Sequence, residues 1–129
     1  MRTRRSSGPG LGIVDVYDTA GHLLQRIGTG GTLNAPWGMA LAPAGFGDFS
    51  NSLLVGNFGD GRINAYDVAT GQFLGQLRAP NGDVIAIDGL WGMAFGNNLN
   101  NQPSTTLFFA AGPNDEANGL YGRIDVASP

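Results

Sequence analysis

Five oxygen-bearing side chains in two segments of the sequence have the chemistry of a metal site or a polar-ligand site. Asn57 and Asp60 lie close together, and Asn114, Asp115 and Glu116 are consecutive and form the best local cluster. Amide and carboxylate oxygens are the ligands that Ca²⁺ prefers in proteins. These five residues are therefore candidate ligand-binding or metal-binding residues. Asn and Asp are also common turn formers, and their spacing here matches no recognised metal-binding loop, so a purely structural role is the alternative.

Two tryptophans are candidates for contact with a flat ligand. Trp37 and Trp91 each begin the sequence Trp-Gly-Met-Ala, at the start of an expected strand. An indole at the mouth of a channel could stack on a sugar or another flat molecule. The alternative interpretation is that both side chains pack between the repeats. No catalytic residue is predicted, because no serine or threonine stands near the single histidine, His22, in a plausible motif, and the chain has no cysteine.

Three imperfect copies of one pattern recur along the chain. The matched segments are 12–18, 61–67 and 122–126; 37–40 and 91–94; 53–55 and 107–109; 22–27 and 72–77. The copies are offset by 49 to 61 residues, and each contains apolar or alternating runs between Gly and Asp turns. A repeat of that length without helical periodicity is typical of the four-stranded blades of a β-propeller. In this alignment Gly61-Arg62-Ile63 matches Gly122-Arg123-Ile124, which gives the two arginines equivalent, structural positions.

The predicted fold is all-β: a partial β-propeller of about two to three four-stranded antiparallel blades. Residues 12–28 are expected to hold the last two strands of one blade, 35–88 a complete blade, and 91–127 the first three strands of the next. The partial propeller would extend over 12–129, and residues 1–11 are expected to be a disordered basic lead-in. Meandering strands place the loop between the second and third strands, and the loop between blades, at the same end. That end is the expected ligand side.

Composition and charge argue against several classes of function. The 22 glycines favour short strands and tight turns over helices, in which each interior glycine costs about 1 kcal/mol. Three of the seven arginines lie in the first five residues and the chain has no lysine. The remainder is acidic and would repel a nucleic-acid backbone, so nucleic acid is not an expected partner. The sequence contains no signal-peptide pattern and no transmembrane segment.

Longer stretches of the repeat resemble a known group of proteins. The segments 34–47, 53–67, 87–96 and 111–122 are similar to a family of uncharacterised secreted bacterial β-propellers. That family is related to NHL-repeat propellers and is often associated with PEP-CTERM sorting tails, and the resemblance extends over about residues 12–124. It implies a propeller of roughly six blades, of which this chain resembles the C-terminal part, and a secreted or periplasmic location. It implies no particular reaction.

The expected function is that of a non-enzymatic binding or interaction module of an extracytoplasmic propeller, with an unspecified ligand. The alternative is a Ca²⁺-dependent hydrolase or lyase of the gluconolactonase kind, because such propellers hold a divalent ion with oxygen ligands like the five named above. Two or three blades alone would leave two sheet faces bare. The expected partners are therefore other copies of the chain, in a homo-oligomer, or further blades of a longer chain.

Overall fold

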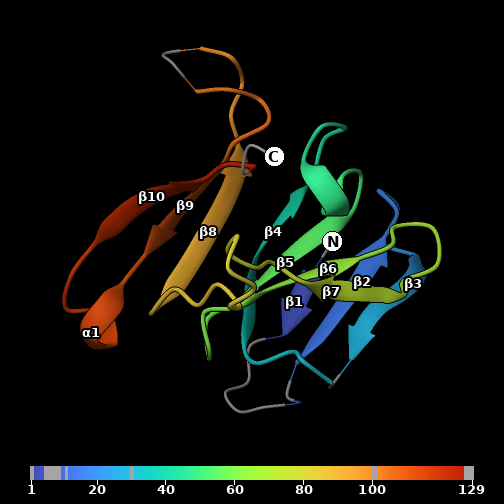
Figure 1. Ribbon diagram of the computed structural model, residues 1–129. Coiled ribbons are helices and arrows are strands. Elements are labelled where there is room, and N and C mark those ends of the chain that lie inside the picture. The colour runs from blue at the N-terminus through green and yellow to red at the C-terminus, as the bar shows by residue number, and fades with distance from the viewer. Residues whose placement is uncertain (1, 5–9, 11, 30, 100–101, 127–129) are drawn as a thin grey trace.

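The computed structural model describes five stretches of the chain: residues 2–4, 10, 12–29, 31–99 and 102–126. These residues form three antiparallel sheets with almost no helix, as Figure 1 shows. The prediction of an all-β fold is thereby confirmed. Within the described residues, no helix is long and apolar enough to cross a membrane.

Each sheet is a meander in which strands that follow one another in the chain pair side by side. The first sheet contains β1 (Arg2–Arg4), β2 (Ile13–Tyr17) and β3 (Leu23–Thr29). The middle sheet contains β4 (Pro36–Leu41), β5 (Leu53–Asn57), β6 (Ile63–Tyr66) and β7 (Phe73–Gln76). The third sheet contains β8 (Leu90–Phe95), β9 (Leu107–Ala111) and β10 (Leu120–Ile124). Two short helical segments lie in loops: a 3-10 turn, η1 (Gly47–Phe49), and α1 (Pro113–Glu116).

Strand β1 lies in the segment that the sequence predicts to be a disordered lead-in. Residues 2–4 pair antiparallel with residues 13–15 of β2, so the expected disorder does not hold for these three residues. The open edge of β2 offers unpaired N–H and C=O groups, which an extended segment can satisfy whatever its side chains. The rest of the lead-in, apart from Gly10, lies outside the described residues.

Asp and Gly form the turns that join the last two strands of the first and middle sheets, as predicted. Asp18 follows β2 and Asp67 follows β6, and each carboxylate accepts two backbone N–H groups from residues two to four positions ahead, at 2.8–3.0 Å. Gly21 and Gly71 close these turns with φ of 88° and 75°, a left-handed conformation that suits glycine. The turn chemistry therefore sets where β3 and β7 begin.

The middle sheet is covered on both faces, whereas an antiparallel sheet commonly exposes one face to solvent. Every residue of β5 and β6 is buried. On one face the core is formed by Val14, Ile27, Leu33, Leu53, Val55 and Tyr66. On the other face it is formed by Ala42, Phe46, Leu54, Ile63, Ala65, Leu77, Leu90, Met93 and Leu107. The three sheets are therefore successive layers, with the middle sheet between its two neighbours (Figure 1).

The middle and third sheets come closest where β4 and β8 lie side by side (Figure 1). A Cβ atom added to Gly38 would lie 2.5 Å from the carbonyl oxygen of Trp91, so the two backbones are in direct contact. Gly56 of β5 is also confined, because a Cβ there would lie 2.8 Å from a methyl carbon of Leu90. Glycine inside a strand costs stability and often marks such a close approach. The two sheets converge at β4 and β8, whereas a cleft separates them near β7 and β10.

The third sheet corrects one detail of the repeat alignment. In the middle sheet Tyr66 pairs with Leu53, and in the third sheet Ile124 pairs with Leu107. Leu53 and Leu107 are matched positions of the repeat, so Ile124 corresponds to Tyr66 and not to Ile63. The alternation of side chains along a strand gives the reason. A displacement by three residues would turn Ile124 away from the core against which it packs.

The corrected alignment changes which polar residues are equivalent. Asp125 corresponds to Asp67, and both are followed by Val-Ala. The expected equivalence of Arg62 and Arg123 does not hold. Arg62 precedes β6, whereas Arg123 lies inside β10, donates hydrogen bonds of 2.8 and 2.9 Å to Asp125, and sits 5.6 Å from the centre of the Phe108 ring.

Candidate functional site

Loops of the middle and third sheets meet at one end of β4 and β8 and enclose a small cleft, which we name the loop cleft. Its volume is about 300 Å³. It is lined by Asn34, Phe58, Gly59, Asp88, Gly89, Gly112 and Asp115. Some of these residues lie in loops between the second and third strands of a sheet, and others lie in loops that join one sheet to the next. Both kinds of loop therefore contribute to the end that the sequence predicts to be the ligand side.

Two equivalent backbone hydrogen bonds hold the walls of the loop cleft in place. The N–H of Phe58 donates to the carbonyl of Ala35, and the N–H of Gly112 donates to the carbonyl of Gly89, each at 2.8 Å. The two pairs are the same repeat positions, 54 residues apart. Ala35 and Gly89 both have left-handed backbones, with φ of 50° and 68°. The same tight turn therefore precedes β4 and β8. In each sheet it brings the loop before the first strand against the loop between the second and third strands.

Asn34 and Asp88, the residues before these two turns, place polar side chains in the cleft at equivalent positions. The side chain of Asn34 lies against Gly59, where a Cβ atom would collide with it. A carboxylate oxygen of Asp88 accepts the backbone N–H of Asn114 at 3.0 Å. Neither residue is among the candidates predicted from the sequence. Their equivalence can be read from the sequence, because each stands three positions before the tryptophan of a Trp-Gly-Met-Ala segment.

Of the five predicted oxygen ligands, Asn57 and Asp60 have structural partners. The Asn57 side chain is fully buried, donates to the carbonyl of Thr32 at 2.9 Å and accepts the N–H of Asn34 at 3.1 Å. It thereby fixes the loop before β4. The Asp60 carboxylate accepts the N–H of Arg62 at 3.0 Å and forms the turn before β6. Neither residue lines the loop cleft.

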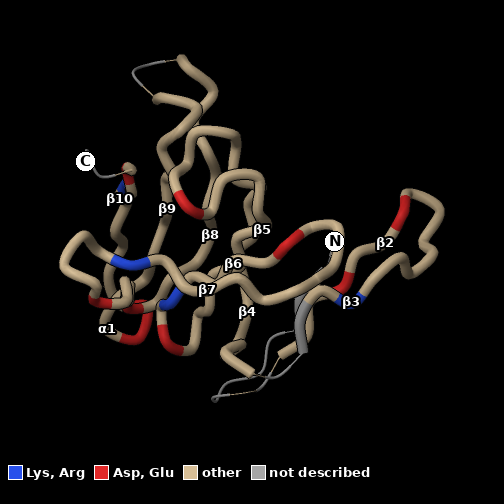
Figure 2. Tube along the Cα trace, turned by 45° about the vertical axis from the view of Figure 1, so that its right-hand side comes forward, with Lys and Arg blue, Asp and Glu red and all other residues tan. Residues whose placement is uncertain are grey.

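The other three predicted ligands lie in α1, and Asp115 is the one that lines the loop cleft. Asn114 donates from its side chain to Asn118 at 2.9 Å. Asn114, Asp115 and Glu116 all have positive φ, between 54° and 66°, a conformation that costs free energy in residues with side chains. Among the described residues, no group of three or more His, Cys, Asp or Glu side chains is arranged to hold a metal ion. Figure 2 shows acidic residues gathered near α1.

The two tryptophans occupy equivalent strands but have different environments. The ring of Trp91 lies against Gly112, because a Cβ on that glycine would collide with the indole. Trp91 therefore packs against one of the residues that line the loop cleft. Trp37 is 46% exposed. Neither indole is among the residues that line the cleft.

The loop cleft is acidic and carries hydrogen-bond acceptors. The two carboxylates of Asp88 and Asp115 and the amide of Asn34 border it, and no described basic residue lines it. Phe58, an aromatic residue, lines the same cleft. Acceptors beside an aromatic ring suit a ligand with several hydroxyl or ammonium groups and an apolar face.

Comparison with known proteins finds similarity to three uncharacterized proteins of Acanthamoeba polyphaga mimivirus. The first is 37% identical over 116 residues, which are 90% of this chain and 30% of the relative. The second is 36% identical over 118 residues, 92% of this chain and 28% of the relative. The third is 36% identical over 91 residues, 70% of this chain and 17% of the relative. The chain thus spans less than a third of the length of each relative, and no protein-family model and no solved structure matches it.

Proposed function

We propose that the chain forms part of a β-propeller and acts as a non-enzymatic binding module. The support is the layered arrangement, in which the middle sheet is buried on both faces and the first strands of two sheets touch. Blades of a propeller pack in this way around a common axis. The resemblance to secreted bacterial propellers related to NHL-repeat proteins remains part of this proposal, together with the secreted or periplasmic location that it implies.

Gly92 supports the proposal that further sheets belong beside the third one. It is the repeat equivalent of Gly38, which contacts the backbone of β8. Gly92 has nothing within 4 Å of an added Cβ atom. A glycine in a strand is unfavourable unless something approaches closely. Another first strand packed on β8 would give Gly92 the role that Gly38 already has.

The exposed outer face of the third sheet favours association, either with copies of the chain or with further sheets of a longer protein. Phe108 and Tyr121 stack on the outer face of the third sheet at 6.0 Å, and Tyr121 is 65% exposed. The mimivirus relatives are more than three times as long as the matched region, which leaves room in them for further sheets. Light scattering on the purified chain tests self-association. A homo-oligomer is expected, and a monodisperse monomer that unfolds sharply would argue against it.

The ligand that best suits the loop cleft is a small hydroxyl-rich molecule such as a saccharide. The observation that carries this proposal is the convergence of Asn34, Asp88 and Asp115 on one cleft that Phe58 also lines. Carboxylates and amides accept hydrogen bonds from hydroxyl groups, and an aromatic ring covers the apolar face of a sugar. A volume of about 300 Å³ is at the lower end of the range for ligand pockets, so one sugar ring is the expected unit.

Saturation-transfer NMR with a panel of monosaccharides and disaccharides tests this function. Binding should be lost in the double variant Asp88→Asn and Asp115→Asn. Each substitution replaces a carboxylate, which accepts hydrogen bonds through two oxygens, with an amide, which has one acceptor oxygen and a donor NH₂ group. The matched control is Asp83→Asn, an exposed carboxylate in the loop before β8 that does not line the cleft. If no sugar gives a signal, or the control weakens binding as much as the double variant, the proposal is rejected.

A second candidate function, the Ca²⁺-dependent hydrolase or lyase, draws on the same cleft. Asp88, Asp115 and Asn34 bring side-chain oxygens of the type that bind Ca²⁺ to one cleft, and of these Asp115 is among the ligands predicted from sequence. A bound ion stabilises the folded state by mass action, about 2.7 kcal/mol at a hundred times the dissociation constant. The melting temperature should therefore rise with millimolar Ca²⁺ and fall back with chelator. An unchanged melting temperature would leave this candidate without support.

A further inference from the structure

The dipeptide Asn-Gly occurs twice in the sequence, as Asn81-Gly82 and as Asn118-Gly119. In this dipeptide the backbone nitrogen of the glycine can attack the side-chain carbon Cγ of the asparagine. Glycine permits the attack because it has no Cβ to shield its nitrogen and adopts a wide range of backbone conformations. The hydrogen bonds around each pair therefore determine which of the two asparagines can react.

The first pair, Asn81-Gly82, lies in a turn held by several hydrogen bonds. The N–H of Gly82, which contains the attacking nitrogen, donates to the carbonyl of Ala79 at 2.9 Å. The Asn81 side chain accepts the N–H of Asp83 at 2.9 Å and donates to its carboxylate at 3.1 Å. Arg78 donates to the carbonyl of Gly82, also at 2.9 Å. Attack at Asn81 requires the Gly82 bond and the side-chain bonds to break first.

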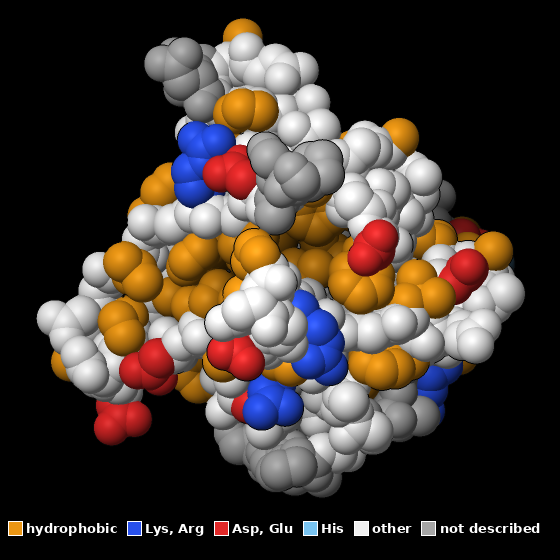
Figure 3. Space-filling model, viewed as in Figure 1, with side chains coloured by type: hydrophobic (Ala, Val, Ile, Leu, Met, Phe, Trp, Pro, Cys, Tyr) orange, Lys and Arg blue, Asp and Glu red, His pale blue; other side chains and the backbone are white. Residues whose placement is uncertain are grey.

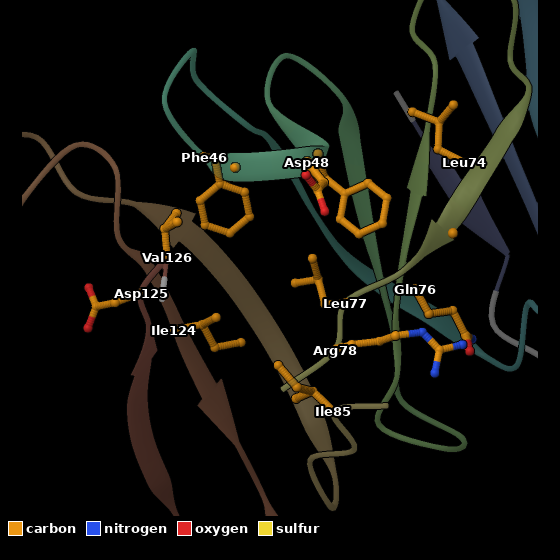
Figure 4. A pocket seen from close by; sticks show the side chains of 13 residues that line it. Phe46, Asp48, Leu74, Gln76, Leu77, Arg78, Ile85, Ile124, Asp125 and Val126 are labelled. Atoms are coloured by element: carbon orange, nitrogen blue, oxygen red, sulfur yellow. The ribbon is translucent and has the colours of Figure 1, made fainter. Parts of the chain in front are cut away.

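The chain on both sides of this turn is also fixed. Arg78 and Val84 form an isolated β-bridge, and Ile85 packs against the core. Figure 4 shows Leu77 and Ile85 pointing into the hollow between the middle and third sheets, in which hydrophobic side chains gather in Figure 3. Movement of the turn away from its hydrogen bonds would therefore disturb these contacts.

The second pair, Asn118-Gly119, lies between α1 and β10, where fewer bonds hold the chain. The N–H of Gly119 donates to no described residue, and an added Cβ on this glycine would meet nothing within 4 Å. Asn118 is exposed, and its own N–H reaches the carbonyl of Pro113 at 3.4 Å. Residues 114–116, just before the pair, all have positive φ. The attacking nitrogen of Gly119 is therefore available without the loss of a hydrogen bond to the protein.

A hydrogen-bond donor already lies on the oxygen of Asn118 that gains negative charge during the attack. The side chain of Asn114 donates to Oδ1 of Asn118 at 2.9 Å. A donor placed in this way stabilises the developing oxyanion. The Asn81 oxygen has a comparable donor in the N–H of Asp83, so the difference between the two pairs depends on the attacking nitrogen.

We propose that Asn118 is a site of spontaneous deamidation in the folded chain. The nitrogen of Gly119 gives its proton to water or hydroxide and forms a bond to Cγ of Asn118. The bond between Cγ and Nδ2 then breaks, and ammonia leaves with a proton taken back from water. Water opens the resulting cyclic imide at either carbonyl, which leaves aspartate or isoaspartate in place of Asn118. Water is the only other reactant, and nothing is oxidised or reduced.

The reaction adds a negative charge and, in isoaspartate, an extra main-chain carbon just before β10. Strand β10 begins at Leu120, which pairs with Ala111 of β9. Asn118 also accepts the hydrogen bond of Asn114, whose backbone N–H donates to Asp88 of the loop cleft. The longer backbone of isoaspartate displaces both connections. Amide exchange at Leu120 and Asn114 should therefore be faster in the isoaspartate form.

Peptide mapping of the full chain after incubation in mildly alkaline buffer tests the proposal. Cleavage after Arg78, Glu116 and Arg123 gives peptides 79–116 and 117–123, which separate the two asparagines. Replacement of NH₂ by OH raises the mass of peptide 117–123, and fragment spectra locate any change at Asn81. Asn118 should react about tenfold faster than Asn81, which is the effect of one or two hydrogen bonds broken before attack. Its rate should rise with pH, because the attacking nitrogen must lose its proton.

Unfolding and a pair of matched variants provide the controls. In guanidinium chloride the hydrogen bonds of both segments are lost, and the two asparagines should react at similar rates. Asn118→Gln keeps the amide but lengthens the side chain by a methylene group, which disfavours ring closure, and it should abolish the fast reaction. Asn81→Gln should leave that reaction unchanged. The proposal is overturned if Asn81 reacts as fast as Asn118 in the folded chain, or if peptide 117–123 changes only after unfolding.

Discussion

Replacing Gly38 with alanine tests the contact between β4 and β8. The added Cβ would lie 2.5 Å from the carbonyl oxygen of Trp91 and 3.3 Å from two further backbone atoms of β8. Ordinary contacts begin near 3.4 Å, so the strands must separate by about 0.9 Å. Backbone cannot rotate away as a side chain can. Overpacking of this kind costs about 1–3 kcal/mol, and the variant should be destabilised by that amount.

The matched control is Gly92→Ala, at the same position of the next repeat copy. A Cβ there meets nothing within 4 Å, and neither glycine has a positive φ. Alanine restricts the unfolded chain more than glycine does, so in the protein diluted to the monomer this variant should be stabilised by about 0.4–1 kcal/mol. The two substitutions are chemically identical and are expected to change stability in opposite directions.

Urea denaturation followed by tryptophan fluorescence measures both differences in free energy of unfolding. The two variants should differ by roughly 1.5–4 kcal/mol. Equal effects of the two substitutions in the monomer would mean that β4 and β8 do not meet, and the layered arrangement would then be refuted. In an oligomer in which another strand covers Gly92, both variants are destabilised, and dilution below the dissociation constant should restore the difference between them.

Three further results are expected. Asn57→Ala should lower the free energy of unfolding by about 2–4 kcal/mol in urea titrations, because two hydrogen bonds of a fully buried amide are lost. Leu54→Ala should cost about 2–5 kcal/mol by the same assay, since its side chain is fully buried between two sheets. Hydrogen bonds from Arg123, and then from Thr106, lower the pKa of Asp125; its stabilising effect is therefore present above the ordinary Asp pKa and is lost as the pH falls through the lowered one. Carboxyl ¹³C NMR titration of Arg123→Met should show the pKa of Asp125 rising toward its ordinary value, and an unchanged pKa would contradict the assigned cause.

The strands and turns could be predicted because their determinants are local. Asp18 and Asp67 form turns through hydrogen bonds to their own neighbours, and glycine supplies the positive φ. Strand β1 could not be predicted, because its side chains carry no alternating pattern and its pairing depends on the open edge of β2. The repeated Gly-Arg-Ile predicts the wrong register for β10, because this match does not reflect the side-chain alternation that places Ile124 on the core.

The sequence predicts the end of the sheets at which the loop cleft lies, but only one of the residues that line it. Loops at one end of the sheets do form a cleft, and Asp115 lines it. Asn57 has the right chemistry for a ligand, yet its amide is buried and bonded to the backbone of the loop before β4. Asn34 and Asp88 reach the cleft because equivalent turns bring two sheets together there, which depends on packing between distant segments.

The stacking of the third sheet on the middle one is tested most directly by nuclear Overhauser contacts between these two layers. A Cβ atom on Gly56 would lie 2.8 Å from a methyl carbon of Leu90 and 3.3 Å from the methyl carbon of Met93. Overhauser peaks are expected from the Gly56 α-protons to both methyl groups. Their absence from a spectrum that contains the cross-strand peaks between β5 and β6 would contradict this stacking.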